Sequence, residues 1–223
     1  MGGSTGIGRA IAQRAADRGD TVVVTSRDGA RAEAVAAEIG GATTGLGVDL
    51  AEPTTIEAAL AGIESVDHLV ITAINQTRQQ LASYDIAEAV ASATIKLVGY
   101  AETVRVLLKR FQPGASVVLF GGLAKERPYP GSTVVTAINA GVTGLMRTLA
   151  VEIAPVRVNA LHSGVVGDSP KWINQQATHP AVARTPIARL VTTAEVADAT
   201  EFLLRNGGMN GHDLVIDGGW LLT

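Results

Sequence analysis

Short apolar runs of strand length alternate with longer amphipathic stretches along most of the chain. Runs such as 115–120 (Ala-Ser-Val-Val-Leu-Phe) hold almost no polar residue, which is typical of strands buried on both faces of a parallel sheet. The stretches between them carry apolar residues at helical spacing, with Gly, Pro or Thr at several of their ends. The pattern predicts strands at 21–25, 43–48, 67–73, 115–120, 156–161 and 213–216, and helices at 9–16, 31–39, 53–61, 84–110, 133–153 and 193–205.

This alternation predicts an α/β fold in which one doubly wound parallel sheet carries helices on both faces, in a single domain over 1–223. Ligands of such sheets bind beyond the carboxyl ends of the strands. These ends carry Thr25-Ser26-Arg27, Asp49-Leu50, Thr72-Ala73-Ile74-Asn75, Gly121-Gly122 and Ser163-Gly164. We therefore expect the functional site at this edge of the sheet.

A glycine-rich loop over 2–8 (Gly-Gly-Ser-Thr-Gly-Ile-Gly) directly precedes the first predicted helix. Glycine lets a ligand approach the backbone, and a helix N-terminus offers free N–H groups to an anion. The loop is a candidate site for a nucleotide pyrophosphate; the alternative is a flexible leader, because its glycine spacing differs from the common dinucleotide fingerprint. A strand should precede such a loop and none does, so we expect the first strand of the sheet to be missing from this sequence.

Composition narrows the possible partners. A net charge of -3, without a long run of like charges, gives no basic surface for nucleic acid. No apolar run approaches the ~20 residues of a membrane span, and the start carries no signal peptide, so we expect a cytoplasmic protein without a membrane partner. The absence of cysteine excludes disulfides and thiol catalysis, and the scattered histidines predict no metal site.

Several motifs follow one another in a characteristic order. They are the loop 2–8, Val48-Asp49-Leu50, Asp67-His68-Leu69-Val70, Arg147-Thr148-Leu149-Ala150-Val151-Glu152, Val156-Arg157-Val158-Asn159-Ala160, Pro186-Ile187-Ala188-Arg189 with Glu195-Val196-Ala197, and Gly211 with Val215-Ile216-Asp217-Gly218-Gly219. In this order they resemble the short-chain dehydrogenase/reductase family over nearly the whole chain.

The resemblance implies a Rossmann-type fold and an oxidoreductase that acts with a nicotinamide cofactor on a small carbonyl or alcohol. It also implies cofactor contacts from Gly2, Ser4, Thr5, Gly6, Ile7, Gly8, Ser26, Arg27, Asp49, Leu50, Thr72, Ala73, Gly164 and Val165.

The end of the second strand of that fold distinguishes the two nicotinamide cofactors. A carboxylate there would accept both ribose hydroxyls of NAD and repel the 2′-phosphate of NADP. Here Ser26 and Arg27 offer a hydroxyl and a guanidinium, which favour NADP over NAD. The alternative for Arg27 is a solvated surface arginine. Asp49 resembles the acid that contacts adenine in the family, and its alternative is a residue that caps a turn.

The family's catalytic positions depart from the usual residues. Carbonyl reduction needs a proton donor at the oxygen, in the family a tyrosine assisted by a lysine, with a serine and an asparagine nearby. By the resemblance, the lysine position is Asn139, the asparagine position is Lys96 and the tyrosine position is Val135. The serine position is Gly121 or Gly122. Lysine and asparagine are thus exchanged, and we expect Lys96 and Asn139 to be the catalytic residues.

Few side chains of this sequence could replace the family's tyrosine as the proton donor. Lys96, if it lies in a desolvated cleft, would have a lowered pKa and serve as an acid; alternatively it binds a carbonyl or pairs with an acid. Tyr129 and His162 are more simply explained as packing residues. Segment 163–190, which contains Trp172, is expected to close over the substrate as a lid, and Trp220 to pack at a subunit interface.

The two longest predicted helices carry apolar residues on more than one face, among them Leu97, Val104, Leu107, Leu108, Val142, Leu145, Met146 and Leu149. This pattern, with the family resemblance, predicts a homodimer or homotetramer.

Three functions remain open. The first is an NADP-dependent oxidoreductase on a small carbonyl or alcohol, with Lys96 as an unusual proton donor. The second is an inactive NADP-binding sensor or assembly partner, and the third is a non-redox isomerase or lyase that uses Lys96 as a base.

Overall fold

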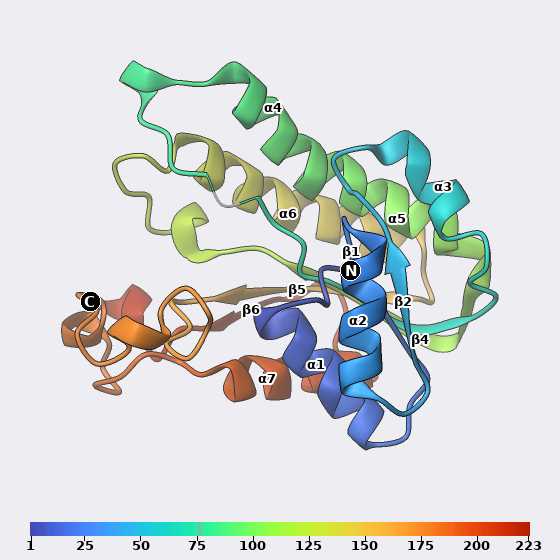
Figure 1. Cartoon of the computed structure of the whole chain (residues 1–223). Coiled ribbons are helices and arrows are strands. Elements are labelled where there is room, and N and C mark those ends of the chain that lie inside the picture. The colour runs from blue at the N-terminus through green and yellow to red at the C-terminus, as the bar shows by residue number, and fades with distance from the viewer. Residues whose placement is uncertain (76) are drawn as a thin grey trace.

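The computed structural model describes residues 1–75 and 77–223 and has the alternating α/β architecture that the sequence predicts (Figure 1). The strands are β1 (Val22–Ser26), β2 (Thr43–Gly47), β3 (Val66–Ile71), β4 (Phe111–Phe120), β5 (Arg157–Ser163) and β6 (Asp213–Ile216). The helices are α1 (Gly6–Asp17), α2 (Gly29–Ile39), α3 (Ile56–Ala59), α4 (Ile86–Ala93), α5 (Tyr100–Leu107), α6 (Thr133–Glu152) and α7 (Thr193–Arg205).

The strands are all parallel, but they form two sheets rather than the single sheet expected from the sequence. One sheet has the order β1-β2 and the other the order β3-β4-β5-β6. Met1 to Gly3 lie between them at the carboxyl ends: Gly3 N donates to Thr25 O over 3.0 Å, and Thr72 N donates to Met1 O over 2.9 Å. The two sheets are thus joined through this segment at the edge where the site is expected.

Alternate side chains of β4 explain why helices cover both faces. Val117 and Leu119 face a core that includes Tyr100 of α5 and Met146 of α6. Val118 and Phe120 face the opposite core, formed with α1 and α7. Figure 1 shows the same layering, with α4, α5 and α6 on one side of the sheet and α1 and α7 on the other.

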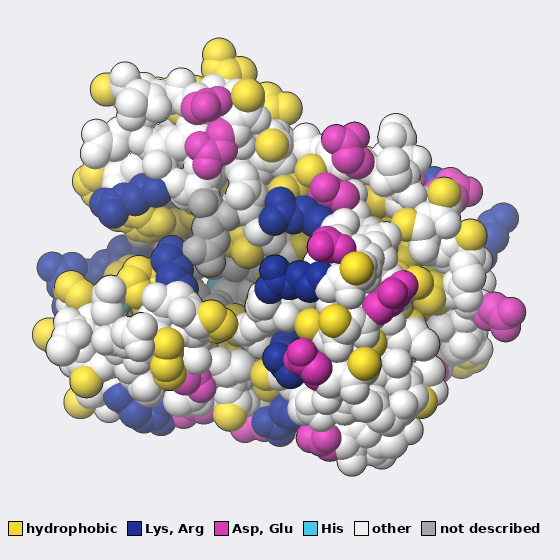
Figure 2. All heavy atoms as spheres, in the orientation of Figure 1, with side chains coloured by type: hydrophobic (Ala, Val, Ile, Leu, Met, Phe, Trp, Pro, Cys, Tyr) yellow, Lys and Arg dark blue, Asp and Glu magenta, His cyan; other side chains and the backbone are white. Residues whose placement is uncertain are grey.

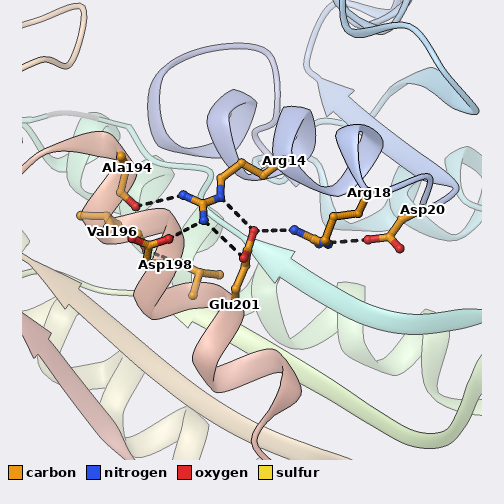
Figure 3. A network of polar contacts seen from close by, with 8 residues as sticks. Arg14, Arg18, Asp20, Ala194, Val196, Asp198 and Glu201 are labelled. Carbon is orange, nitrogen blue, oxygen red and sulfur yellow. Dashed lines mark hydrogen bonds and ion pairs between the residues drawn. The ribbon is translucent and has the colours of Figure 1, made fainter.

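An ionic cluster joins α1 to α7 (Figure 3). Glu201 accepts from Arg14 Nε over 3.0 Å and from Arg18 Nη1 over 2.6 Å. Arg14 also pairs with Asp198, and Arg18 with Asp20. Since α1 begins in the glycine loop, the cluster ties the helix that carries this loop to the body of the molecule.

The apolar faces of α5 and α6 are largely used inside the chain, which corrects the basis of the predicted oligomer. Both helices pack on the sheet, and the side chains that face it are buried in the core; they are Val104, Leu107, Val142, Met146 and Leu149. Apolar side chains that stay exposed on this side of the sheet include Val98, Leu108 and Val151. A homo-oligomer stays a prediction that rests on the family resemblance.

By length and composition alone, α6 is apolar enough to cross a membrane. Its apolar residues are explained by the fold, because Val142 and Met146 are fully buried between α6 and the sheet.

Candidate active site

A cleft of about 660 Å³ opens at the carboxyl edge of the sheets. Every residue that the sequence proposes for cofactor binding or catalysis lines it, although these residues come from loops, strand ends and helices far apart in the chain. In Figure 2 a hollow opens in the middle of the molecule, with Lys and Arg side chains on both of its sides. The residues that the sequence proposes for the site therefore share one cleft at the edge that the topology predicts.

The glycine loop is shaped by close packing on the end of β3. Gly2 has a φ of +78°, and a Cβ there would lie 2.8 Å from Ala73 N and 2.9 Å from Thr72 Oγ1. A Cβ on Gly8 would lie 2.3 Å from Gly2 O. Thr5 precedes α1 without a side-chain cap, so the N–H groups of the first turn remain available to an anion.

Two arginines line the cleft beside β1. Arg27 follows Ser26 at the strand end, and Arg31 lies one turn into α2. Neither forms an ion pair with a carboxylate among the described residues, whereas nearby Arg9 pairs with Glu38 over 2.8 Å. The sequence analysis does not propose Arg31; its place in the first turn of the helix that follows Arg27 was the available signal.

Asp49 lines the cleft and also caps a turn, because its Oδ1 accepts from Ala51 N over 2.9 Å. Asp49 can therefore cap this turn and still face a ligand in the cleft, so the two interpretations of this residue are compatible. Leu50 packs against the helix that carries Lys96: a Cβ on Gly99 would lie 2.5 Å from Leu50 O. Gly164 and Val165, after β5, line the cleft as expected.

Lys96 lies in a π-helical turn, Thr94–Gly99, between α4 and α5, where the sequence predicts a continuous helix. Such turns commonly mark functional sites. The side chain is 1% exposed, and Nζ donates to Phe120 O over 3.0 Å and to Asn139 Oδ1 over 3.1 Å. Burial lowers the pKa of Lys96 to about 8, and no carboxylate among the described residues pairs with it to offset that effect.

The Lys96 contact also sets the orientation of Asn139. An ammonium group only donates hydrogen bonds, so the amide oxygen faces Nζ and the amide nitrogen points away from it. A Cβ on Gly122 would lie 2.9 Å from Asn139 Nδ2, while a Cβ on Gly121 would lie 2.2 Å from the ring of His162. Of the two candidate serine positions, only position 122 therefore faces Asn139.

One tyrosine hydroxyl, that of Tyr100, lies next to this pair, but it is not suited to act as the acid. Val135 lines the cleft one helical turn before Asn139. Tyr100 is fully buried, and its hydroxyl lies 2.8 Å from Ala73 O and 3.3 Å from Phe120 O, the carbonyl oxygen that Lys96 also binds. Burial raises the pKa of Tyr100, so its hydroxyl keeps its proton. Tyr129 lines the cleft but is 45% exposed, with the Arg78 guanidinium 5.9 Å from its ring centre.

His162 is a buried packing residue with an unexpected partner. Its Nε2 lies 2.7 Å from Asp213 Oδ1, and its Nδ1 is buried without a hydrogen-bond partner. Desolvation lowers the pKa of His162 and outweighs the effect of Asp213, so the ring is neutral. The ring fills the space that a side chain at position 121 would need.

The cleft wall also contains Arg127 and Trp220, which the sequence does not identify as site residues. The Trp220 ring lies beneath the Arg127 guanidinium, whose carbon is 4.5 Å from the ring centre; a place for Trp220 at a subunit interface stays a prediction. Among the described residues there is no group of three acidic or histidine side chains that would hold a metal ion.

The residues that line the cleft are suited to a nicotinamide dinucleotide. The glycines bring the backbone close to the ligand space, and the start of α1 offers N–H groups. Arg27 and Arg31 offer positive charge and have no ion-pair partner within residues 1–75 and 77–223. Its volume is also within the usual range for cofactor sites.

Comparison with known proteins agrees with this geometry. Residues 2–221 match the family model described as enoyl-(acyl carrier protein) reductase. The chain is similar to a 3-oxoacyl-(acyl-carrier-protein) reductase of Bos taurus, with 31% identity over 232 residues that cover 100% of this chain and 97% of the relative. It is also similar to carbonyl reductase family member 4 of Xenopus laevis, with 32% identity over 98% of this chain and 95% of the relative.

A solved structure described as a short-chain dehydrogenase/reductase family protein has a TM-score of 0.88 to this chain. The sequence identity is 30%, and the match covers 100% of this chain and 95% of the other.

Proposed function

Because the chain belongs to the short-chain dehydrogenase/reductase family and is an oxidoreductase of that family, we propose that it reduces a small carbonyl compound with NADP as cofactor and Lys96 as proton donor. The observation that carries the proposal is the buried Lys96 ammonium in the cleft wall, hydrogen-bonded to Asn139. A cytoplasmic location and a homo-oligomer belong to the same proposal.

Lys96 has the properties of a general acid near neutral pH. Its pKa of about 8 keeps it protonated at pH 7 and makes the proton easier to release than that of an exposed lysine. An ammonium has a further N–H beyond the two that bind Phe120 O and Asn139 Oδ1. In this proposal that N–H serves the substrate oxygen.

Asn139 would hold the substrate carbonyl. Its Nδ2 faces the space over Gly122, and Lys96 polarises the amide from the oxygen side. When bound, reduced NADP would supply a hydride to the carbonyl carbon. Lys96 would give its proton to the carbonyl oxygen, so that an alcohol forms and Lys96 is left as a neutral amine that solvent reprotonates.

Arg27 and Arg31 support the choice of NADP. Two guanidinium groups without a carboxylate partner among the described residues favour the extra phosphate. Asp28, the first carboxylate after β1, caps α2 by accepting from Arg31 N and is not among the residues that line the cleft. The names of the relatives, a 3-oxoacyl-(acyl-carrier-protein) reductase and a carbonyl reductase, make acetoacetyl thioesters and simple ketones the first substrates to try.

The test combines binding with turnover. Binding of NADPH and NADH is measured by fluorescence, and NADPH consumption is then followed with acetoacetyl-CoA and a panel of ketones. We expect NADPH to bind more tightly than NADH, and Lys96→Met to bind NADPH normally while losing turnover. The exposed Lys109→Met is the matched control and should retain turnover.

The other outcomes select the alternatives. Tight NADPH binding without turnover on any carbonyl would favour a sensor or assembly partner. Substrate conversion without net NADPH consumption would favour an isomerase or lyase. Full activity of Lys96→Met would remove Lys96 from the mechanism.

A further inference from the structure

Arg127 is held in one orientation at the cleft wall. It follows β4 by a short turn and is half-buried. Its Nη1 donates to Trp220 O over 2.7 Å, and its guanidinium carbon lies 4.5 Å from the centre of the Trp220 ring. The hydrogen bond holds the edge of the guanidinium and the Trp220 ring holds its face, so the two contacts together fix its plane.

The support beneath Arg127 is itself rigid. The Asp217 carboxylate accepts from Gly219 N over 2.8 Å and from Leu221 N over 2.9 Å, which folds the chain tightly around Trp220. Gly219 has a φ of +87°, and a Cβ there would lie 3.0 Å from Pro186. The C-terminal turn is therefore packed against segment 163–190, and Arg127 is positioned before any ligand arrives.

The remaining donors of Arg127 have no acceptor within the part of the chain that the structure describes. The adjacent Glu126 pairs with Lys125 over 3.0 Å instead, and both oxygens of Asp217 are engaged by backbone N–H groups. A guanidinium that is partly removed from water, fixed in its plane and without a carboxylate matches the geometry of a carboxylate receptor.

Arg127 belongs to the substrate part of the cleft. Arg127 contacts Leu123, through its backbone N–H, and Trp220, and both also line the cleft, as does Val135. Gly122, which faces Asn139, lies five residues before Arg127 in the chain. Arg27, which follows β1, and Arg31 of α2 are the groups assigned to the 2′-phosphate in the proposed function, and Arg127 lies on a different segment of the cleft wall, after β4.

We propose that the substrate is an oxo acid, and that Arg127 binds its carboxylate while the carbonyl lies at Lys96 and Asn139. This inference rests on the proposed reductase function, and it assigns Arg127 as the residue that selects an anionic over a neutral substrate. The fork of the guanidinium would accept both carboxylate oxygens, and the Trp220 ring would shield the pair from water.

Binding is tested without turnover. In a Trp172→Phe background, Trp220 is the only tryptophan of the chain, so its fluorescence reports on the Arg127 site. Pyruvate, acetoacetate and levulinate are titrated beside their methyl esters, with and without NADP⁺. We expect at least one acid to bind at least about 10-fold more tightly than its ester, and Arg127→Gln to abolish that preference.

Controls separate recognition from a structural role. Arg147→Gln, a mostly exposed arginine outside the cleft wall, should leave the preference for the acid unchanged. Arg127→Lys keeps the positive charge but loses the two parallel N–H donors of the guanidinium, and it should retain part of the preference for the acid. If Arg127→Gln weakens acid and ester equally and lowers the melting temperature, Arg127 only clamps the C-terminal turn and the proposal is overturned.

Failure of this inference is distinct from failure of the proposed function. Equal binding of acids and esters, or binding of neither, in both the presence and absence of NADP⁺ overturns the role of Arg127, even if NADPH binds and ketones are reduced. A clear acid preference without NADPH binding would support Arg127 as a carboxylate receptor and contradict the reductase proposal.

Discussion

Lys96 and Asn139 meet in the cleft wall through a 3.1 Å hydrogen bond from Nζ to Oδ1. Relative to the positions implied by the family resemblance, the two residue types have exchanged places, and the contact pairs one ammonium with one amide in a buried space. A buried site of this kind tolerates one charge far better than two.

Exchanging the two residues tests this pairing. Asn139→Lys alone would bury two ammonium groups and destabilise the fold by about 3 kcal/mol or more. The double variant Lys96→Asn with Asn139→Lys restores one ammonium and one amide, and should recover at least about 1 kcal/mol relative to the sum of the two single changes. Chemical denaturation of the four proteins measures this coupling energy, and purely additive effects would contradict a direct pairing.

The pH dependence of carbonyl reduction should report on Lys96. Because its pKa is lowered to about 8, the protonated acid is present below that pH and is lost above it. We expect kcat/KM for reduction to fall about tenfold per pH unit above about pH 8. A rate that stays level up to pH 10 would assign the proton to another group.

The free energy of unfolding should depend on the same titration, but it should rise with pH where the reduction rate falls. The folded-state pKa of Lys96, about 8, lies below the ordinary value of 10.5, so burial of the ammonium weakens the fold at neutral pH. That penalty is relieved as the pH rises from about 8 to 10.5. Across this window the free energy of unfolding of the unmodified protein should increase relative to that of the Lys96→Met variant. Urea denaturation of both proteins at several pH values measures the difference.

Arg27 and Arg31 should determine cofactor preference. Removal of either by alanine substitution is expected to weaken NADPH binding about 10- to 100-fold, as for loss of a charge-assisted hydrogen bond, and to change NADH affinity by no more than about twofold. Arg9→Ala, which breaks the surface pair with Glu38, is the control and should alter neither affinity. Equal losses for both cofactors would show that the arginines do not contact the 2′-phosphate.

Gly121 should tolerate no side chain, because a Cβ there would lie 2.2 Å from the His162 ring. Gly121→Ala is expected to lower the free energy of unfolding by about 1 to 3 kcal/mol. Gly144→Ala in α6, where a Cβ meets nothing within 4 Å, should stabilise the helix by about 0.5 to 1 kcal/mol. His162→Ala should remove most of the penalty of Gly121→Ala in the double variant; an unchanged penalty would mean that another contact causes it.

The sequence alone determined the class of fold and the edge of the sheet that holds the site. Apolar runs such as that of β4, at 115–120, and helical spacing are local properties of the chain, and topology then places the loop 2–8, Arg27 and Asp49 at one edge. Lys96 and Asn139 are proposed as catalytic residues from the family resemblance rather than from the topology.

Only the tertiary structure decided which side chains touch. Lys96 and Asn139 are 43 residues apart and Arg127 and Trp220 are 93 apart, and no local pattern specifies either contact. The π-helical turn that aims Lys96, the His162 ring beside Gly121 and the burial of α5 and α6 all depend on how elements pack and in which register. Distances of a few ångströms arise from that packing, and they decide the chemistry of the cleft.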